Sequence, residues 1–204
     1  SDGNSRYSDG HAYCFVCHNY EPGDGGDHHH QHAPPKQRAM LKGNPVALKK
    51  RNLTEEQCRK YRIHKDGDTL RMHYFDKSGQ VVAAKVKTKD KRFWMEGDNV
   101  DHQLFGQNLF PDTGTRLTIY EGELDAVSGY AAMPTWPHMS IPNGAASAKK
   151  DIQNVIPLCQ GYETVVFFFD NDAPGIQAAQ DCAALLPPGK AKIARLEKYK
   201  DASD

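Results

Sequence analysis

The sequence lacks the features that would place the chain in a membrane or make it a disulfide scaffold. Its 204 residues contain no apolar run of the roughly 18 to 20 residues that a membrane-spanning helix needs. No positively charged stretch followed by an apolar one, as in a signal peptide, lies at its start. Cysteine is scarce and odd in number, with 5 residues, which argues for a reducing compartment. We therefore expect a protein of the cytoplasm.

The formal net charge is zero, but the charges are unevenly distributed along the chain. Residues 36–92 contain 17 Lys and Arg against 6 Asp and Glu, whereas residues 93–204 contain 8 against 15. A basic segment followed by an acidic one predicts a surface for a polyanion beside a site for cations. The alternative is that charges divide by chance among solvent-exposed faces, but basic clusters are typical of nucleic-acid-binding surfaces, which favours the first interpretation.

Composition and periodicity divide the chain into four segments. Residues 1–20 are short and polar and contain the motif Cys14-x-x-Cys17. Residues 21–38 are rich in Gly, Pro and His without helical or strand periodicity, which predicts a flexible linker. The remaining two segments, residues 39–114 and 115–204, have regular patterns and are expected to hold the folded core.

Residues 39–114 are predicted to form a small basic α+β subdomain. Thr54, followed three residues later by Gln57, has the pattern of a capping box and begins a predicted helix. Residues 69–75 and 81–87 alternate like strands around a turn signal, which predicts a hairpin. A loose segment, residues 97–114, is expected to follow the hairpin.

Residues 115–204 alternate between strand and helix patterns. The predicted strands are residues 116–120, 139–142, 164–169 and 191–196, and the predicted helices are residues 124–132, residues 147–158 and a helix from Pro174. Such alternation is typical of a parallel sheet with helices on both faces. Ligands of these α/β sheets bind at the carboxyl ends of the strands, so the residues there are the candidates for function.

Carboxylates follow three of the predicted strands. Glu121 follows the strand of residues 116–120, and Asp201 comes after the last strand. Asp170 and Asp172 follow residues 164–169, a continuous apolar run that predicts a strand buried on both faces. Carboxylates that lie close together repel one another unless a cation sits between them, and oxygen ligands favour Mg²⁺ or Mn²⁺. Each motif alone could instead be a helix-terminal charge or a turn former. Their combination at strand ends favours a metal site.

The spacing of Glu121 and Asp170-x-Asp172-x-x-Gly175 resembles the Toprim domain of topoisomerases and primases. Further motifs resemble the primase half of the T-odd phage primase–helicases, in order and over nearly the whole chain apart from the linker. They are Ser1-Asp2-Gly3-Asn4-Ser5, Ser8-Asp9-Gly10-His11, Tyr13-Cys14-Phe15-Val16-Cys17, Gln103-Leu104-Phe105-Gly106, Glu121-Gly122-Glu123-Leu124-Asp125, Gly144-Ala145-Ala146-Ser147-Ala148-Lys149-Lys150 and Lys200-Asp201-Ala202. The resemblance implies an α/β fold, with a Toprim-type parallel sheet preceded by the basic subdomain and a partial zinc-ribbon module.

The resemblance also implies the activity and its partners. The family makes short RNA primers on a single-stranded DNA template from ribonucleoside triphosphates, by nucleotidyl transfer that depends on Mg²⁺ or Mn²⁺. A ring helicase follows in the full-length family, covalently linked, and the replisome DNA polymerase is a further expected partner. The quoted sequence contains no Walker-type phosphate loop. A phage-encoded protein of this kind is expected in the host cytoplasm.

The resemblance assigns roles to the carboxylates and to the basic run. Asp170, Asp172 and Asp201 would hold the metal ions, and Glu121 would act as a further ligand or as a catalytic base. Five cations lie within residues 85–92. Lysines at a strand edge often only prevent edge-to-edge pairing, but the resemblance gives the basic residues catalytic or nucleotide- and template-binding roles. The catalytic ones are Lys85 and Lys91, and the binding ones are Arg51, Lys85, Lys89 and Lys91.

The motif Cys14-x-x-Cys17 is half of a four-ligand zinc site, because structural zinc takes four ligands. In the family an earlier Cys-x-x-Cys lies just upstream, so we expect Zn²⁺ if the full-length protein contains that pair. Either the quoted sequence is truncated or the protein lacks the site, and we favour truncation. His11 matches a position that the family associates with template reading, although a plain surface histidine is an alternative.

Two other functions have to be separated from primer synthesis. A Toprim nuclease would use the same acidic residues to cut DNA without needing a nucleoside triphosphate. A non-catalytic DNA-binding module would keep the Toprim fold as a scaffold, but the complete set of Glu121, Asp170 and Asp172 speaks against it.

Overall fold

The protein is described from a computed structural model, which describes residues 4–6, 12–14, 20–21, 41–90, 92–98, 100 and 102–196. The chain divides into two compact units, Ser1–Lys36 and Gln37–Asp204. Within the described ranges no helix is both long and apolar enough to cross a bilayer. The two units are described separately.

The first unit contains a small antiparallel sheet. Its strands, in the order β1-β2-β3, are β1 (Asn4–Arg6), β2 (Ala12–Cys14) and β3 (Tyr20–Glu21). Cys14 ends β2, whereas Cys17 and His11 lie outside the described residues. The zinc half-site therefore stays a prediction.

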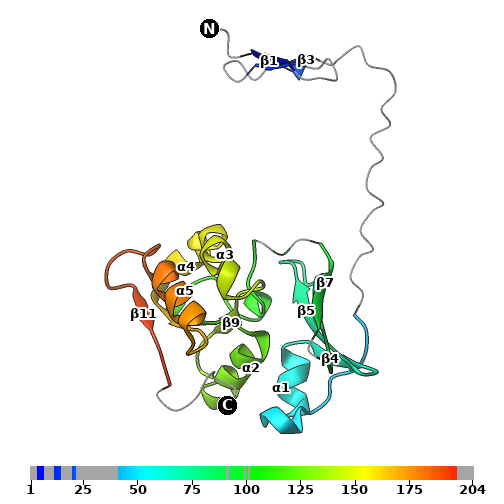
Figure 1. The fold of residues 1–204 in the computed structure, drawn as a ribbon. Coiled ribbons are helices and arrows are strands. Elements are labelled where there is room, and N and C mark those ends of the chain that lie inside the picture. The colour runs from blue at the N-terminus through cyan, green and yellow to red at the C-terminus, as the bar shows by residue number, and fades with distance from the viewer. Residues whose placement is uncertain are drawn as a thin grey trace. The chain divides into compact units, whose positions relative to one another are not determined.

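The second unit begins with an antiparallel sheet and one short helix (Figure 1). The strands run in the order β4-β5-β6-β7 and comprise β4 (Ile63–Asp66), β5 (Thr69–Phe75), β6 (Val81–Thr88) and β7 (Phe93–Gly97). A 3-10 turn, η1 (Lys49–Arg51), and helix α1 (Glu55–Lys60) precede them. The Thr54 hydroxyl accepts from Gln57 N at 3.2 Å, and Gln57 Oε1 accepts from Thr54 N at 2.8 Å. The predicted capping box is therefore confirmed.

The other half of this unit is a parallel sheet in the order β11-β10-β8-β9. Its strands are β8 (Gly114–Tyr120), β9 (His138–Ser140), β10 (Tyr162–Phe168) and β11 (Ala191–Ile193). The helices are α2 (Glu123–Ala132), α3 (Ala148–Asn154), α4 (Ile156–Gln160) and α5 (Ala173–Ala183), with 3-10 turns η2 (Gln107–Leu109) and η3 (Ala145–Ser147). The expected α/β fold with a parallel sheet and a preceding α+β part is confirmed.

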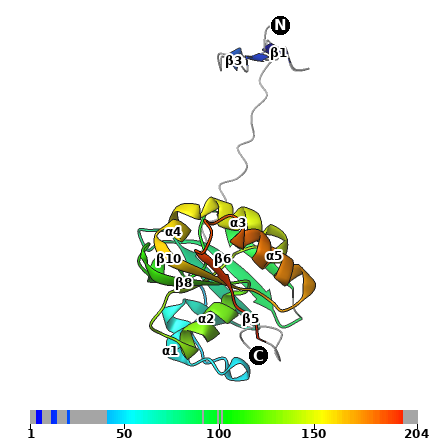
Figure 2. The same cartoon turned by 90° about the vertical axis from the view of Figure 1, so that its left-hand side faces the viewer.

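Helices cover both faces of the parallel sheet, as Figure 2 shows together with Figure 1. The apolar residues of β8 and β10 pack with α3, α4 and α5 into one core. Helix α2 contributes Val127 to a second core, where it meets Tyr74 of β5. Tyr120 and His138 press against α2 at Gly129, where an added Cβ would lie 2.0 Å from the Tyr120 hydroxyl. Helix α2 thus packs against both sheets, and this packing fixes the position of Glu123 at its N-terminus.

Several details differ from the sequence-based expectation. Strand β9 is His138–Ser140 and not residues 139–142, and β11 is Ala191–Ile193 and not residues 191–196. The helix predicted over residues 147–158 is two helices, because Pro157 can occupy the first turn of α4 but could not donate a backbone hydrogen bond inside a longer helix. Strands β4 and β7 were not predicted. The loose segment expected over residues 97–114 contains the η2 turn.

Candidate active site

Two carboxylate-bearing residues lie together at the carboxyl edge of the parallel sheet. Tyr120 of β8 pairs with Phe168 of β10, so the residues just after these strands are neighbours. Glu121 Oε2 accepts a hydrogen bond from the backbone N–H of Asp170 at 3.4 Å. The structure therefore brings together two of the residues that the sequence selects.

A third segment, the loop between β9 and α3, closes on the same carboxylate. The backbone N–H of Ala145 donates to Glu121 Oε1 at 3.3 Å. Gly144 precedes it with φ of 71°, a backbone conformation that favours glycine. Buried Asp151 holds the loop, because its two carboxylate oxygens accept from Asn143 N at 3.3 Å and from Asn143 Nδ2 at 3.0 Å. Glu121 is thus fixed by backbone donors from two sides.

The electrostatic setting of Glu121 suits a cation. Burial raises the pKa of Glu121 above its usual value, and the negative charges of Asp170 and Asp172 raise it further, while the two backbone N–H groups lower it. A positive ion beside these oxygens would remove the repulsion. The all-oxygen donor set therefore fits Mg²⁺ or Mn²⁺. Within the part of the chain that the structure describes, no three His, Cys, Asp or Glu residues form a complete cluster for a metal ion.

Asp172 has a structural role as well. Its Oδ1 accepts a hydrogen bond from the backbone N–H of Gly175 at 3.0 Å and caps the N-terminus of α5. A local structural role for this motif, as a turn former, was the alternative to metal binding at the level of the sequence. Two other predicted site residues, Asp201 and Lys91, lie outside the described residues. Their placement in the site therefore stays a prediction.

A buried polar triad connects the basic sheet to the acidic edge. Lys85 Nζ of β6 lies 2.6 Å from Glu123 Oε1, and the Tyr74 hydroxyl of β5 donates to the same oxygen at 2.7 Å. The Lys85 and Glu123 side chains are 16% and 6% exposed. Glu123 begins α2 two residues after Glu121, so the ion pair connects Lys85 of the antiparallel sheet to the helix that follows the acidic strand end.

The remaining predicted basic residues line a groove of about 610 Å³. Lys85 pairs in register with Met72, and Lys87 with Leu70, which confirms that both lysines are on one face of the hairpin. Leu70 and Leu124 contribute apolar surface to the groove. Its basic lining consists of Lys49, Lys50, Arg51, Lys65, Lys87 and Lys89. The groove therefore offers concentrated positive charge at its wall.

The sequence did not identify Glu123, Tyr74 and Asp151, whose hydrogen bonds and ion pairs hold Lys85 and the loop next to Glu121. Glu123 had been considered only as a helix-terminal charge and as part of the motif Glu121-Gly122-Glu123-Leu124-Asp125, and Tyr74 had been considered only as a strand residue. Asp151 was placed in a helix without a role. The sequence Pro142-Asn143-Gly144 is a turn pattern that could have located this loop at the end of a strand.

Comparisons with known proteins agree with this geometry. Residues 118–204 match the Toprim-like family, and residues 43–97 match the family described as the N-terminal a+b fold of bacteriophage T7 DNA helicase/primase. The chain is 31% identical, over 225 residues, to the DNA helicase/primase of Enterobacteria phage T3. That match covers 100% of this chain and 39% of the phage T3 protein, so the chain spans well under half of its relative.

Two solved structures from bacteriophage T7 are similar over most of their length. The primase fragment of the primase-helicase protein is 31% identical with a TM-score of 0.75, over 100% of this chain and 88% of that one. A complex of the lagging-strand DNA polymerase with primase domains bound to an RNA/DNA hybrid and dTTP gives 31% identity and a TM-score of 0.71. It covers 79% of this chain and 84% of that one. With its Toprim fold, basic subdomain and acidic strand-end site, this chain belongs to the primase family of the T3 and T7 phage helicase/primases.

Proposed function

We propose that this chain makes short RNA primers on single-stranded DNA by metal-dependent nucleotidyl transfer. The observation that carries the proposal is the position of Glu121, which is held by backbone N–H groups of Asp170 and Ala145 and lies two residues before Glu123, the partner of Lys85. We infer that these acidic oxygens and the Lys85 ammonium act on one substrate at the carboxyl edge of the sheet. The family membership of the chain supports the same reaction.

In the proposed reaction the 3′-hydroxyl oxygen of one nucleotide attacks the α-phosphorus of the next. The bond to the pyrophosphate oxygen breaks, and the hydroxyl proton passes to a base. Glu121, whose pKa is raised, would accept that proton or share in holding a cation. Lys85 would offset negative charge on the triphosphate. Divalent cations, held by Glu121, Asp170, Asp172 and Asp201, would supply positive charge to the attacking and leaving oxygens.

The partners follow from this reaction and from the relatives. The T7 complex contains primase domains bound to an RNA/DNA hybrid and dTTP, together with the lagging-strand DNA polymerase. We infer that this chain binds a single-stranded DNA template and ribonucleoside triphosphates and works beside a replicative DNA polymerase. A covalently linked ring helicase, a zinc site completed around Cys14 and Cys17, template reading by His11 and a place in the host cytoplasm belong to the same proposal.

Primer synthesis on a random single-stranded template library tests the function. The chain is incubated with labelled ribonucleotides, Mg²⁺ and the library, and the products are resolved by length. We expect short oligoribonucleotides that require template, triphosphates and metal together. Cleavage of the library without triphosphates would support a nuclease instead, and template binding without any product would support a non-catalytic module.

Binding of single-stranded DNA should depend on salt because the groove wall is basic. We expect the logarithm of the association constant to fall linearly with the logarithm of the salt concentration. The slope should be about −0.7 for each phosphate contact. Lys89→Ala should lower that slope by about one such contact, since Lys89 lines the groove. Titration of a labelled oligonucleotide at four salt concentrations measures both quantities. A slope of zero, or the same slope in the variant, would contradict a role for Lys89 in phosphate binding.

A further inference from the structure

Phe93 is a large apolar side chain that the fold leaves in solvent. It is 71% exposed, more than the other large hydrophobic side chains of the described residues that reach the surface. It begins β7, which is an edge strand of the antiparallel sheet. Edge strands are usually protected by charge against association with other chains. A phenyl ring exposed on such a strand is therefore available for contact with a ligand.

The strand register places Phe93 on the basic face of the sheet. Phe93 pairs with Lys87, and Lys87 pairs with Leu70, so the three form one row across β7, β6 and β5. Lys87 and Leu70 both line the basic groove. Lys85 lies two residues along β6 on the same face and reaches Glu123. The Phe93 ring therefore lies on the same face of the sheet as Lys85 and Lys87, next to a residue that lines the basic groove.

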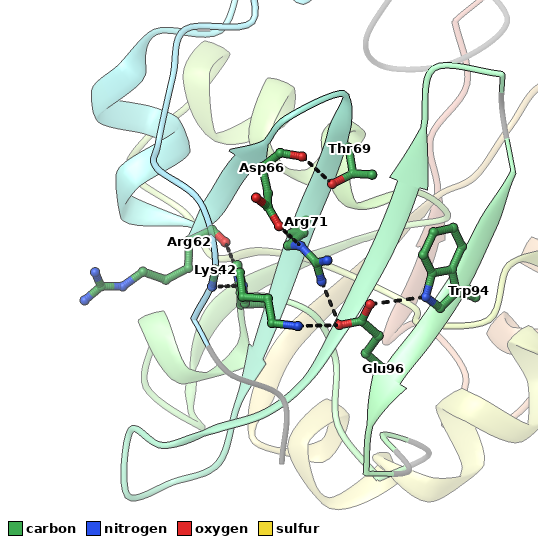
Figure 3. A network of polar contacts seen from close by, with 8 residues as sticks. Lys42, Arg62, Asp66, Thr69, Arg71, Trp94 and Glu96 are labelled. Atoms are coloured by element: carbon green, nitrogen blue, oxygen red, sulfur yellow. Dashed lines mark hydrogen bonds and ion pairs between the residues drawn. The ribbon is translucent and has the colours of Figure 1, made fainter. Parts of the chain in front are cut away.

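The neighbouring aromatic residue on the same strand has a different setting. Trp94 pairs with Val86, which pairs with Arg71, so Trp94 lies on the opposite face. Its indole N–H donates to Glu96 Oε1 at 3.3 Å, and Glu96 forms an ion pair with Arg71 at 2.7 Å (Figure 3). Trp94 is thus integrated into a polar network of the protein, whereas Phe93 stands beside the groove.

We propose that Phe93 is a stacking platform for a base of the single-stranded DNA template. A phenyl ring offers a flat apolar face to any base, while lysines beside it hold the phosphates, and this combination is how proteins bind single strands without reading sequence. The platform would hold the template at a distance from the reacting atoms. Phe93 is therefore a binding residue for the template and not part of the catalytic machinery. This inference rests on the proposed primer synthesis and adds a base contact to its template path.

A binding experiment with two probes separates stacking from charge. One probe is a labelled single-stranded 20-mer of random sequence, and the other is an abasic deoxyribose phosphate strand of the same length, with the same charges but no bases. For Phe93→Ala we expect binding of the base-containing strand to weaken by about tenfold, the loss of one stacked base. Binding of the abasic strand should not change.

Matched variants define the origin of the effect. Trp94→Ala, an exposed aromatic on the other face of the same strand, should bind both probes like the wild type. Phe93→Leu keeps the apolar volume and should resemble Phe93→Ala, whereas Phe93→Tyr should retain wild-type affinity because the ring remains. Lys87→Ala should weaken the binding of both probes. Thermal midpoints of all four Phe93 and Trp94 proteins should stay close together, since both side chains reach solvent.

The outcomes distinguish this inference from the proposed function. Equal loss of both probes in Phe93→Ala, or wild-type affinity for both, would overturn the stacking platform while primer synthesis by the wild type continued. Retained affinity in Phe93→Leu would also overturn it, since that result means apolar packing without stacking. A base-dependent loss in a chain that makes no primers would support the platform and refute the proposed function.

Discussion

Asp170→Asn should abolish primer synthesis while leaving the thermal stability of the protein unchanged or slightly higher. Asparagine has nearly the shape of aspartate, and the hydrogen bond to Glu121 comes from the backbone N–H of residue 170, which the substitution keeps. The change removes one negative charge from the acidic edge. We expect the rate to fall by on the order of 10³-fold, or about 4 kcal/mol of transition-state stabilisation.

The expected stability follows from the pKa of Glu121. Burial and the charge of Asp170 raise this pKa in the folded state, so the ionised Glu121 costs stability at pH values above it. That cost is absent at low pH, where the carboxyl is protonated in both states. Without Asp170's charge the pKa of Glu121 moves down and the cost at pH 7.5 decreases. The thermal midpoint in metal-free buffer should therefore stay level or rise.

Mg²⁺ titration and a second variant test this explanation. A ligand at 100 times its dissociation constant stabilises the folded state by about 2.7 kcal/mol, so Mg²⁺ should raise the midpoint of the wild type and do so less in Asp170→Asn. Asp112→Asn is the control, because it also removes one negative charge, but from an exposed residue that precedes β8. It should leave synthesis and the Mg²⁺ response intact. Near-normal synthesis by Asp170→Asn, or a wild type indifferent to Mg²⁺, would contradict the metal assignment.

The sequence predicted the parallel sheet well because its signals are local. The run from Thr164 to Phe169 is continuously apolar, as in a strand buried on both faces, and Pro174 occupies the first turn of α5. Strand β7 was missed because its exposed pattern, with Phe93 and Trp94 both at the surface, lacks a buried alternation. β7 pairs with β6 as a hairpin across the short connection of residues 89–92. The Lys-Asp-Lys-Arg sequence of this connection lacks the Gly- or Asn-containing pattern that is typical of a hairpin turn.

The sequence predicted the carboxylates at the strand ends but not the buried partner of Lys85. Strand ends and spacing identified Glu121 and Asp170, because parallel strands deliver their carboxyl ends to one edge. The partner of Lys85 could not be predicted, since Lys85 and Glu123 are 38 positions apart in the chain. They meet only because α2 packs on the antiparallel sheet through a shared core. Tertiary packing, and no local motif, decides where that ammonium lies.

Lys85→Met should cost both stability and synthesis, and a second substitution should restore only the first. Lys85→Met leaves the Glu123 carboxylate buried with Tyr74 as its one remaining partner of the triad. Removing one member of a buried ion pair costs about 3–5 kcal/mol, because the other charge stays desolvated without compensation. Chemical denaturation measures this loss, and synthesis should fall by about 10²-fold or more.

The double variant Lys85→Met with Glu123→Gln removes both charges and keeps an acceptor for the Tyr74 hydroxyl. It should recover most of the lost stability, since replacing a buried ion pair by neutral groups of similar volume is often nearly neutral. Synthesis should not recover, because no ammonium then faces the triphosphate. The separation of the two readouts is the expected signature of a charge that acts on substrate.

The exposed ion pair of Lys77 and Asp112 provides the matched control, because it joins the same two chemical groups at 3.2 Å but its side chains are 87% and 55% exposed. Lys77→Met, alone or with Asp112→Asn, should change the free energy of unfolding by no more than about 1 kcal/mol and leave synthesis intact. If Lys85→Met with Glu123→Gln regained synthesis along with stability, Lys85 would serve only to satisfy Glu123. Loss of synthesis in a stable double variant would instead support a direct action of the Lys85 ammonium on the triphosphate.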